Sequence, residues 1–373
     1  MEDEIMSEAA VLGSGNAACA YAAYLGKRGH KIHLYDSVRF ESNLTPIKDY
    51  GGLDLIGADQ GFGSVFKVTT DIEDAIKGIK VLFVVLPAFG HKSTAEALAP
   101  YVENGQIIVL NPGAVLGAAE FLHTLRDCGC TKDITMIELA SNIFACRRTG
   151  PTVVDIFGKK AKLEAASIPA DRIRHAIEEL NVFFPDTFVP QENVLYTSLT
   201  YTNMIIHPVG SVLNMGHIEW THGDFLFYWE GMTPGVCRNA ACVDAERMAV
   251  GRALGTDLMS FPDVTRQYYG HPERTTMYEI LSQSEVNDHA GVPSAPKDLS
   301  SRYITEDIPY ALVPLSALGH ALGVETPVID ALITLAGVAN QTDYRRVGRT
   351  LESLGLEGLG RDRILECITT GRW

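Results

Sequence analysis

One segment near the amino terminus constrains the fold of this chain more than any other, because three patterns follow one another in it. An apolar run, "AAVLG", leads into a glycine-rich turn, an alanine-rich stretch follows, and a second apolar run ends at Asp36. Gly13, Gly15 and Ala18 have the G-x-G-x-x-G/A spacing, which permits a tight turn after a strand and close packing of the next helix. The segment therefore predicts a strand, a turn and a helix that begin a dinucleotide-binding fold.

The first half of the chain continues this alternation of apolar runs and helical patterns. Five apolar runs indicate buried parallel strands, at residues 9–13, 31–36, 80–87, 106–113 and 133–140. Helices are expected at residues 16–28 and 93–99, the second with Ser93 and Glu96 spaced as a capping box. Residues 152–167 predict a hairpin or a pair of strands at the far edge of the same sheet. Strands that alternate with helices favour a doubly wound, mainly parallel sheet.

The pattern changes near residues 183–193, a segment with two prolines and several polar residues. Beyond it strand signals nearly vanish and helix signals dominate. Three threonines are placed to cap such helices: Thr233 and Thr326, each followed by proline, and Thr342. We therefore expect an α/β N-terminal Rossmann domain over residues 1–190, followed by a mostly α-helical C-terminal domain over residues 191–373.

Composition excludes several classes of protein. The 373 residues are 46% hydrophobic and carry a net charge of −15, so neither nucleic acid nor an anionic membrane is an expected partner. The first residues lack a basic and apolar leader, and no apolar run is long enough to span a bilayer. The seven cysteines are scattered and odd in number, which favours reduced thiols in a cytoplasmic protein.

The glycine-rich turn and Asp36 predict the cofactor. The start of the helix after the turn offers free N–H groups to a pyrophosphate, and Asp36 is placed to accept from the ribose hydroxyls of NAD. Its charge would repel a 2′-phosphate, but Arg39 lies three residues on and keeps NADP open. The expected cofactor-binding residues are Gly13, Gly15, Asn16, Ala17, Asp36, Leu86, Pro87, Asn111 and Gly113. For each of the last four, an ordinary turn between strand and helix explains the sequence about as well.

A histidine inside the apolar stretch "TNMIIHPVGS" is the main catalytic candidate. On a helix Asn203, His207, Gly210 and Asn214 fall on one narrow face, and apolar residues cover the rest. This pattern is typical of a buried helix that lines a wet cleft, and Pro208 is expected to kink or end it. A lone histidine among apolar residues is more often a hydrogen-bonded core residue than a catalyst, so the pattern alone leaves both interpretations open.

Arg302 and Asp307 flank a segment that we expect to be short and extended. A carboxylate beside an imidazole fixes its tautomer, and an arginine fork suits a substrate carboxylate. The sequence does not bring this segment to His207, and on spacing alone a solvated surface loop explains it slightly better. The stretch "GHIEWTHGD" lacks the helical histidine pair of a zinc hydrolase, so we interpret it as a polar loop and expect no metal site.

Taken together, these motifs resemble the opine dehydrogenase family, which includes octopine, nopaline and N-(1-carboxyethyl)norvaline dehydrogenases. The matching pieces include "VLGSGNAACAYAAYL", "VVLPAFGH", "IIVLNPGA", "ENVLYTSLTYTNMIIHP", "SRYITEDIPYALVPLSALG" and "TDYRRVGRTLESLGLEGL". They extend from about residue 9 to about residue 359, nearly the full chain. The combination of N-x-x-x-H-P with R-Y-x-x-E-D is far more specific than the glycine motif.

This resemblance implies an enzyme that condenses a 2-oxo acid, usually pyruvate, with the amine of an L-amino acid and reduces the product with NAD(P)H. It makes His207 the acid/base residue, Asp307 its carboxylate partner and Arg302 the residue that holds a substrate carboxylate. Asn203 belongs to the family's pattern as a substrate-binding candidate. The family contains monomers and dimers, so either a monomer or a homodimer is expected.

Two other functions remain open at this stage. A 2-oxo acid or ketone reductase of the same two-domain plan would make a hydroxy acid without an amine. Such relatives depend on a catalytic lysine, whereas the predicted helix offers Asn203 and His207 and no lysine. A non-catalytic NAD-binding sensor would explain the glycine turn but would leave Arg302 without a task.

Overall fold

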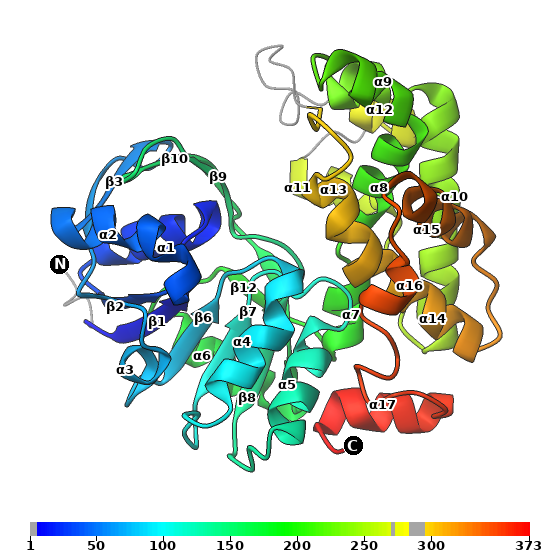
Figure 1. Ribbon diagram of the computed structural model, residues 1–373. Helices are drawn as coiled ribbons and strands as arrows, with labels where there is room; N and C mark the ends of the chain where they lie inside the picture. The colour runs from blue at the N-terminus through cyan, green and yellow to red at the C-terminus, as the bar shows by residue number, and fades with distance from the viewer. Residues whose placement is uncertain (1–5, 270–272, 283–294) are drawn as a thin grey trace. The chain divides into compact units, whose positions relative to one another are not determined.

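The computed structural model describes residues 6–269, 273–282 and 295–373 (Figure 1). The chain forms two compact units, which we call the N-terminal unit (residues 1–198 and 366–373) and the helical unit (residues 199–365). We predict a domain boundary after residue 190. The structure divides the chain after Ser198, inside helix α7 (Val194–Leu199), and returns the last residues to the N-terminal unit.

The N-terminal unit is built on an eight-stranded sheet with the order β12-β11-β8-β7-β6-β1-β2-β5. All neighbours are parallel except β8 and β11, which are antiparallel. The strands are β1 (Glu8–Leu12), β2 (Lys31–Tyr35), β5 (Lys67–Thr69), β6 (Val81–Val84), β7 (Ile107–Leu110), β8 (Thr135–Leu139), β11 (Leu163–Ile168) and β12 (Phe188–Pro190). The doubly wound sheet and the helical unit confirm the predicted fold class. All five predicted strands are present: β1 has the predicted length but begins one residue earlier, and the other four are shorter than predicted.

A second sheet of four strands covers helix α1 (Asn16–Lys27) on the side away from the large sheet (Figure 1). Its order is β4-β3-β10-β9, with the bounds β4 (Gly61–Ser64), β3 (Gly52–Gly57), β10 (Val153–Lys159) and β9 (Phe144–Arg148). The hairpin predicted for residues 152–167 is therefore wrong. β10 pairs with β3 and β9 in the small sheet, whereas β11 pairs with β8 in the large one.

Packing between the two sheets explains why α1 is rich in small residues. Every residue from Ala18 to Gly26 is buried. A Cβ atom at Gly26 would lie 2.0 Å from the Ser64 carbonyl oxygen, and one at Gly63 would lie 2.0 Å from the Ala23 carbonyl oxygen. The backbone of α1 therefore touches the backbone of β4, and at these two positions only glycine permits so close an approach.

The remaining helices of the N-terminal unit are α2 (Glu41–Tyr50), α3 (Ile72–Ile76), α4 (His91–Leu98), α5 (Gly117–Asp127) and α6 (Ile173–Leu180). The predicted capping box at Ser93 is wrong. A 3₁₀ turn at Ala88–Gly90 leads directly into α4, so the helix begins at His91 and Ser93 already lies in its first turn. The Ser93 hydroxyl donates to the Gly90 carbonyl oxygen at 3.2 Å.

The helical unit contains no strand among its described residues. Its helices are α8 (Asn203–Leu213), α9 (Met215–Thr221), α10 (Pro234–Ala253), α11 (Phe261–Tyr269), α12 (Met277–Ser282), α13 (Arg302–Thr305), α14 (Val313–Ala321), α15 (Pro327–Ala339) and α16 (Tyr344–Val347), and α17 (Arg361–Thr370) ends in the N-terminal unit. Two short π-helical turns, Phe227–Gly231 and Ile308–Leu312, interrupt the regular helices. Among the described residues, none of the helices has the length and apolar composition needed to cross a membrane.

The caps of these helices only partly follow the prediction. Thr233 caps α10, since its hydroxyl accepts from the Val236 N–H at 3.5 Å. Thr326 occupies the N-cap of α15 but makes no such bond. Thr342 is not a cap, because Asp343 takes this position for the short helix α16.

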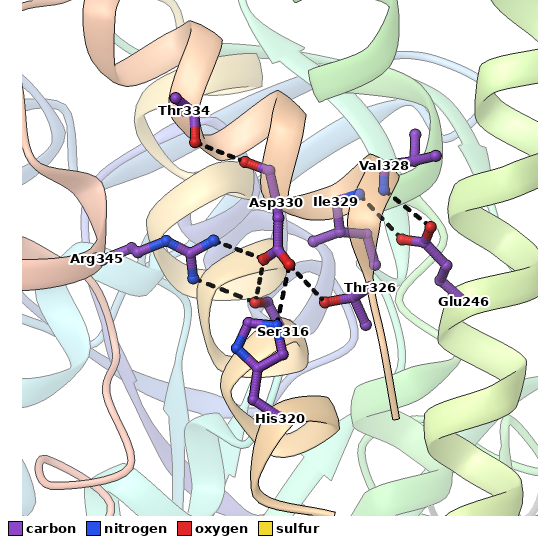
Figure 2. Close-up of polar contacts among 9 residues, drawn as sticks. All are labelled: Glu246, Ser316, His320, Thr326, Val328, Ile329, Asp330, Thr334 and Arg345. Atoms are coloured by element: carbon purple, nitrogen blue, oxygen red, sulfur yellow. Dashed lines mark hydrogen bonds and ion pairs between the residues drawn. The ribbon is translucent and has the colours of Figure 1, made fainter. Parts of the chain in front are cut away.

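A carboxylate from another helix caps α15 in place of Thr326. Glu246 of α10 accepts from the N–H groups of Val328 and Ile329 at 2.9 and 3.0 Å (Figure 2). Beside it, the Asp330 carboxylate binds four side chains: Ser316 at 2.6 Å, His320 at 2.9 Å, Arg345 at 2.5 Å and Thr326 at 3.4 Å (Figure 2). These contacts tie α10, α14, α15 and the start of α16 together.

Candidate active site

The predicted nucleotide-binding turn has the geometry that its glycines require. Gly13 has a φ of +124°, and a Cβ atom there would lie 2.5 Å from the Val85 carbonyl oxygen. At Gly15 the reverse holds, because a Cβ atom would meet nothing within 4 Å. No side chain caps the start of α1, for which Gly15 is the N-cap. The turn therefore combines open space at Gly15 with an uncapped helix start, two features that an anion site needs.

Asp36 lies beside this turn, where the sequence placed it. Its carboxylate accepts from the Ser14 hydroxyl at 2.5 Å and from the Ser37 N–H at 2.8 Å. The side chain is buried, and burial raises the pKa of Asp36 above its ordinary value, against these hydrogen bonds. Arg39 is exposed, and its guanidinium lies over the Phe40 ring at 5.6 Å.

Arg148 contacts this turn, and the sequence analysis did not select it. From β9 of the small sheet, its guanidinium donates to the carbonyl oxygens of Ser14 at 3.3 Å and Asn43 at 3.0 Å. The backbone N–H of Arg148 donates to the side-chain oxygen of Asn16 at 3.0 Å. Only the pairing of the second sheet brings residue 148 to this position, and no local motif in the sequence indicates it.

Four further candidates follow β6 and β7, at the carboxyl edge of the large sheet. Leu86 and Pro87 are partly buried beside the glycine turn and at the start of the 3₁₀ turn that leads into α4. Asn111 donates its amide to the Asn142 side-chain oxygen at 2.6 Å. A Cβ atom at Gly113 would lie 2.4 Å from a carbon of the Glu138 side chain, so packing over that side chain requires glycine here.

In the helical unit, the structure brings the predicted histidine and aspartate together. The Nδ1 atom of His207 lies 2.7 Å from Oδ2 of Asp307, and only 12% and 4% of the two side chains are exposed. Helix α8 continues through Pro208 to Leu213, so the proline does not end it. Because the carboxylate occupies Nδ1, the Nε2 atom is the ring nitrogen left to exchange a proton with a substrate.

Three tyrosines that the sequence analysis did not select surround this pair. The Tyr201 hydroxyl donates to the second oxygen of Asp307, Oδ1, at 2.7 Å. The Tyr303 ring stacks on the imidazole of His207, with 3.7 Å between the centroids and an angle of 8°. The Tyr228 hydroxyl lies 3.4 Å from Nε2 of His207. The first two tyrosines stand within the motifs quoted above, so their neighbourhood to His207 and Arg302 was a usable signal.

Arg302 and Asn203 lie at the ends of helices near the pair. Arg302 begins α13, so the expected extended segment is wrong; its side chain is 65% exposed and its Nη1 atom lies 3.4 Å from a Glu306 oxygen. Asn203 begins α8, and its amide donates to the Tyr201 hydroxyl at 3.3 Å. Asp307, at the other end of the same motif, precedes the π-helical turn Ile308–Leu312.

The stretch "GHIEWTHGD" is mostly helical, which corrects the expected polar loop. Helix α9 covers Met215–Thr221, and the ring of His217 packs edge-on against Phe225, with 4.3 Å between the ring centroids. Within the part of the chain that the structure describes, no three metal-binding side chains are grouped closely enough to hold an ion.

Two protein-family models match this chain, one in each half. A family model described as "NAD/NADP octopine/nopaline dehydrogenase, alpha-helical domain" matches residues 190–340, and one described as "Ketopantoate reductase PanE/ApbA" matches residues 9–126. An opine dehydrogenase of Arthrobacter sp. (strain 1C) is 38% identical over 94% of this chain and 95% of its own length. The protein ocs of Agrobacterium tumefaciens (strain Ach5) is 25% identical over 97% of this chain and 99% of its own length.

Two solved structures share the fold. Octopine dehydrogenase in complex with NADH and L-arginine superposes with a TM-score of 0.79 at 21% identity, over 99% of this chain and 98% of that one. Yersinopine dehydrogenase with NADP⁺ bound gives a TM-score of 0.73 at 16% identity, over 99% of both chains. At these sequence identities, the structural similarity supports the fold alone.

Proposed function

Because this chain belongs to the opine dehydrogenase family, we propose that His207 is the acid/base residue of its reaction and Asp307 the carboxylate partner of that histidine. The enzyme is an NAD(P)-dependent oxidoreductase of the CH–NH group, which joins a 2-oxo acid to an amino acid through a secondary amine. The observation that supports these roles is the 2.7 Å contact between Nδ1 of His207 and Oδ2 of Asp307.

The chemistry of the reaction explains why such a pair is needed. When the amine adds to the 2-oxo acid, the carbinolamine must lose its hydroxyl as water before it can be reduced. Nε2 of a protonated His207 supplies the proton for this step, and Asp307 stabilises the imidazolium. In the reverse direction neutral His207 takes a proton from the attacking water. NAD(P)H, when bound, supplies the hydride.

We assign the substrate carboxylate to Arg302. Its side chain is 65% exposed, and its Nη1 atom lies 3.4 Å from a Glu306 oxygen, so a planar carboxylate can approach the rest of the fork. We propose pyruvate as the 2-oxo acid and an L-amino acid as the amine donor, with Asn203 beside them. A fixed carboxylate contributes by orientation, since it decides which face of the prochiral carbon receives the hydride.

For the cofactor, we propose a site around the glycine-rich turn. The open space at Gly15 and the uncapped start of α1 fit a pyrophosphate, and Asp36 fits the ribose hydroxyls of NAD. The exposed Arg39 leaves NADP as the second choice. The residues proposed to contact the cofactor are Gly13, Gly15, Asn16, Ala17, Asp36, Leu86, Pro87, Asn111 and Gly113.

We further propose that the enzyme works in the cytoplasm, because all seven of its cysteines are free thiols. The assembly stays a prediction: either a monomer or a homodimer, which sedimentation of the purified protein would distinguish.

Substitution of the histidine tests the catalytic assignment. We expect His207→Asn to keep the fold and NADH binding but to lose turnover by about 10²-fold or more, the usual contribution of a general acid. Steady-state rates and the quenching of protein fluorescence by NADH measure the two properties separately. His217→Asn, an exposed histidine on the next helix, is the matched control and should keep its rate. Near-normal turnover in His207→Asn would remove His207 from the mechanism.

The alternative is a reductase that makes a hydroxy acid. The match of residues 9–126 to a ketopantoate reductase model favours it for the nucleotide-binding half alone. Such an enzyme would reduce the oxo acid without any amine, so the amine dependence of turnover separates the two functions.

A further inference from the structure

We propose that Tyr201 is a positioning residue that sets the proton affinity of His207 through Asp307. Three elements supply the chain of contacts. Tyr201 lies in the turn between α7 and α8, His207 lies on α8, and Asp307 immediately precedes a π-helical turn. Asp307 uses one oxygen for each partner: Oδ2 for His207 and Oδ1 for the Tyr201 hydroxyl, both at 2.7 Å. The proposal rests on the role of His207 argued above.

The Tyr201 hydroxyl is held as a donor toward Asp307. It accepts from the Asn203 amide at 3.3 Å, which leaves its proton for Oδ1 of the carboxylate. Tyr201 is 4% exposed, and burial, followed by the charges of Asp307 and Glu306, raises its pKa well above 10. The hydroxyl therefore keeps its proton at every pH at which the enzyme is expected to work.

The backbone beside Tyr201 is also fixed. Arg247 of α10 is fully buried and donates to the Leu199 carbonyl oxygen at 2.7 Å. Its guanidinium is itself bound by Asp244, with contacts of 2.6 and 2.9 Å. A charged, buried clamp thus holds the chain two residues before the tyrosine, so the phenol cannot easily move away from the carboxylate.

A hydroxyl that donates to the Asp307 carboxylate changes the proton affinity of His207 in a defined direction. The donor at Oδ1 stabilises the negative charge of Asp307 and makes the carboxylate less basic. A less basic carboxylate stabilises the imidazolium of His207 less, so Tyr201 lowers the pH at which the histidine loses its proton. It also fixes the rotation of the carboxylate, so that Oδ2 faces Nδ1.

The other polar groups around the pair do not replace this contact. Glu306 is buried next to Asp307 and its carboxylate has Arg302 3.4 Å away. Tyr303 covers the imidazole face, and the Tyr228 hydroxyl lies at Nε2, on the far side of the ring from Asp307. From α10, Asp244 and Arg247 bind each other. All of these groups are retained when only the Tyr201 hydroxyl is removed.

Tyr201→Phe tests the proposal because it removes one oxygen and keeps the ring. In the reductive direction, kcat/KM falls as pH rises, because His207 must be protonated; in the oxidative direction it rises, because His207 must be neutral. We expect the midpoints of both profiles to move upward by about 0.5 to 1 pH unit in the variant. NADH binding should be unchanged.

Tyr344→Phe is the matched control. Tyr344 is buried in the same unit, and its hydroxyl accepts from the Asn340 amide at 2.8 Å. We expect both midpoints to be those of the unmodified enzyme. If Tyr201→Phe does not fold, Asn203→Ala, which removes the donor to the Tyr201 hydroxyl, should move the midpoints in the same direction by a smaller amount.

A direct titration separates this proposal from the proposed function. The imidazole signals of the enzyme without substrate can be followed by NMR with labelled histidine, and the His207 signal is the one that His207→Asn lacks. We expect a higher titration midpoint in Tyr201→Phe even if the enzyme uses another substrate. An unchanged midpoint, with or without a loss of kcat, would overturn the proposal. A shifted midpoint in an enzyme that needs no amine would retain it and overturn the opine synthesis.

Discussion

At the scale of single residues, the site depends on groups whose environment changes their chemistry. His207 was visible in the sequence because a lone imidazole in an apolar helix needs a partner. Asp307 was a candidate for that partner from its chemistry, but only the family's motif connected it to His207. For Tyr201 the only signal was its place in the quoted motif beside His207, and for Arg148 no local signal exists, since a tyrosine in a turn or an arginine in a strand has many ordinary uses. Their roles depend on contacts across 106 and 134 positions of the chain.

Asp36 carries the prediction on cofactor choice. Its burial raises its pKa above 3.8, and the ionised form is the one that binds ribose hydroxyls. NADH affinity should therefore weaken as pH falls through a value higher than that of an ordinary aspartate. Asp36→Asn should remove this dependence and reduce the preference for NADH over NADPH by about tenfold, measured from the Kd values of both cofactors. The exposed Asp49→Asn is the control. A preference unchanged in Asp36→Asn would exclude Asp36 from the ribose site.

At the scale of elements, the sequence predicted strands and helices well where one pattern is long and isolated. It failed where the tertiary partner of an element decides which sheet a strand joins or which group caps a helix. Residues 153–159 and 163–168 look like a hairpin, but each finds a different sheet. Likewise Thr326 is well placed as a cap, but Glu246 of α10 satisfies the same N–H groups. Such outcomes follow from tertiary contacts that a local reading of the sequence does not contain.

At the scale of elements, we predict the effect of adding a methyl group at Gly210. It lies on α8 where the helix meets the π-helical turn that carries Tyr228, and a Cβ atom there would lie 2.4 Å from the Phe227 ring. Alanine favours a helix by about 1 kcal/mol over glycine, but overpacking costs about 1 to 3 kcal/mol. We expect the packing to decide, so that Gly210→Ala lowers the free energy of unfolding by about 1 kcal/mol or more and slows turnover.

The control for this variant is Gly216 on α9, where a Cβ atom would meet nothing within 4 Å. Urea titrations of both variants measure the free energy of unfolding. In them Gly216→Ala should be neutral or stabilising by up to about 1 kcal/mol. Equal effects at the two positions would show that space at Gly210 is not what limits the substitution.

At the scale of the whole molecule, the alternation of strands and helices and then their replacement by helices alone were enough to predict the architecture. The division itself is less simple than a single boundary, because residues 366–373 return to the N-terminal unit. The predicted division had no second boundary, because a return of the chain to an earlier unit is a tertiary feature that local sequence patterns do not contain. The family was accessible from the sequence because its two motifs, near residues 203–208 and 302–307, are specific in combination.

The central claim is that the enzyme couples the reduction of a 2-oxo acid to an amine. The most direct measurement is the consumption of NADH with pyruvate, with and without each common L-amino acid, and again with NADPH. We predict oxidation that requires both pyruvate and one class of amino acid and that is faster with NADH. Oxidation of NADH by the oxo acid alone, unchanged by any amine, would contradict the account and make the protein a hydroxy-acid dehydrogenase.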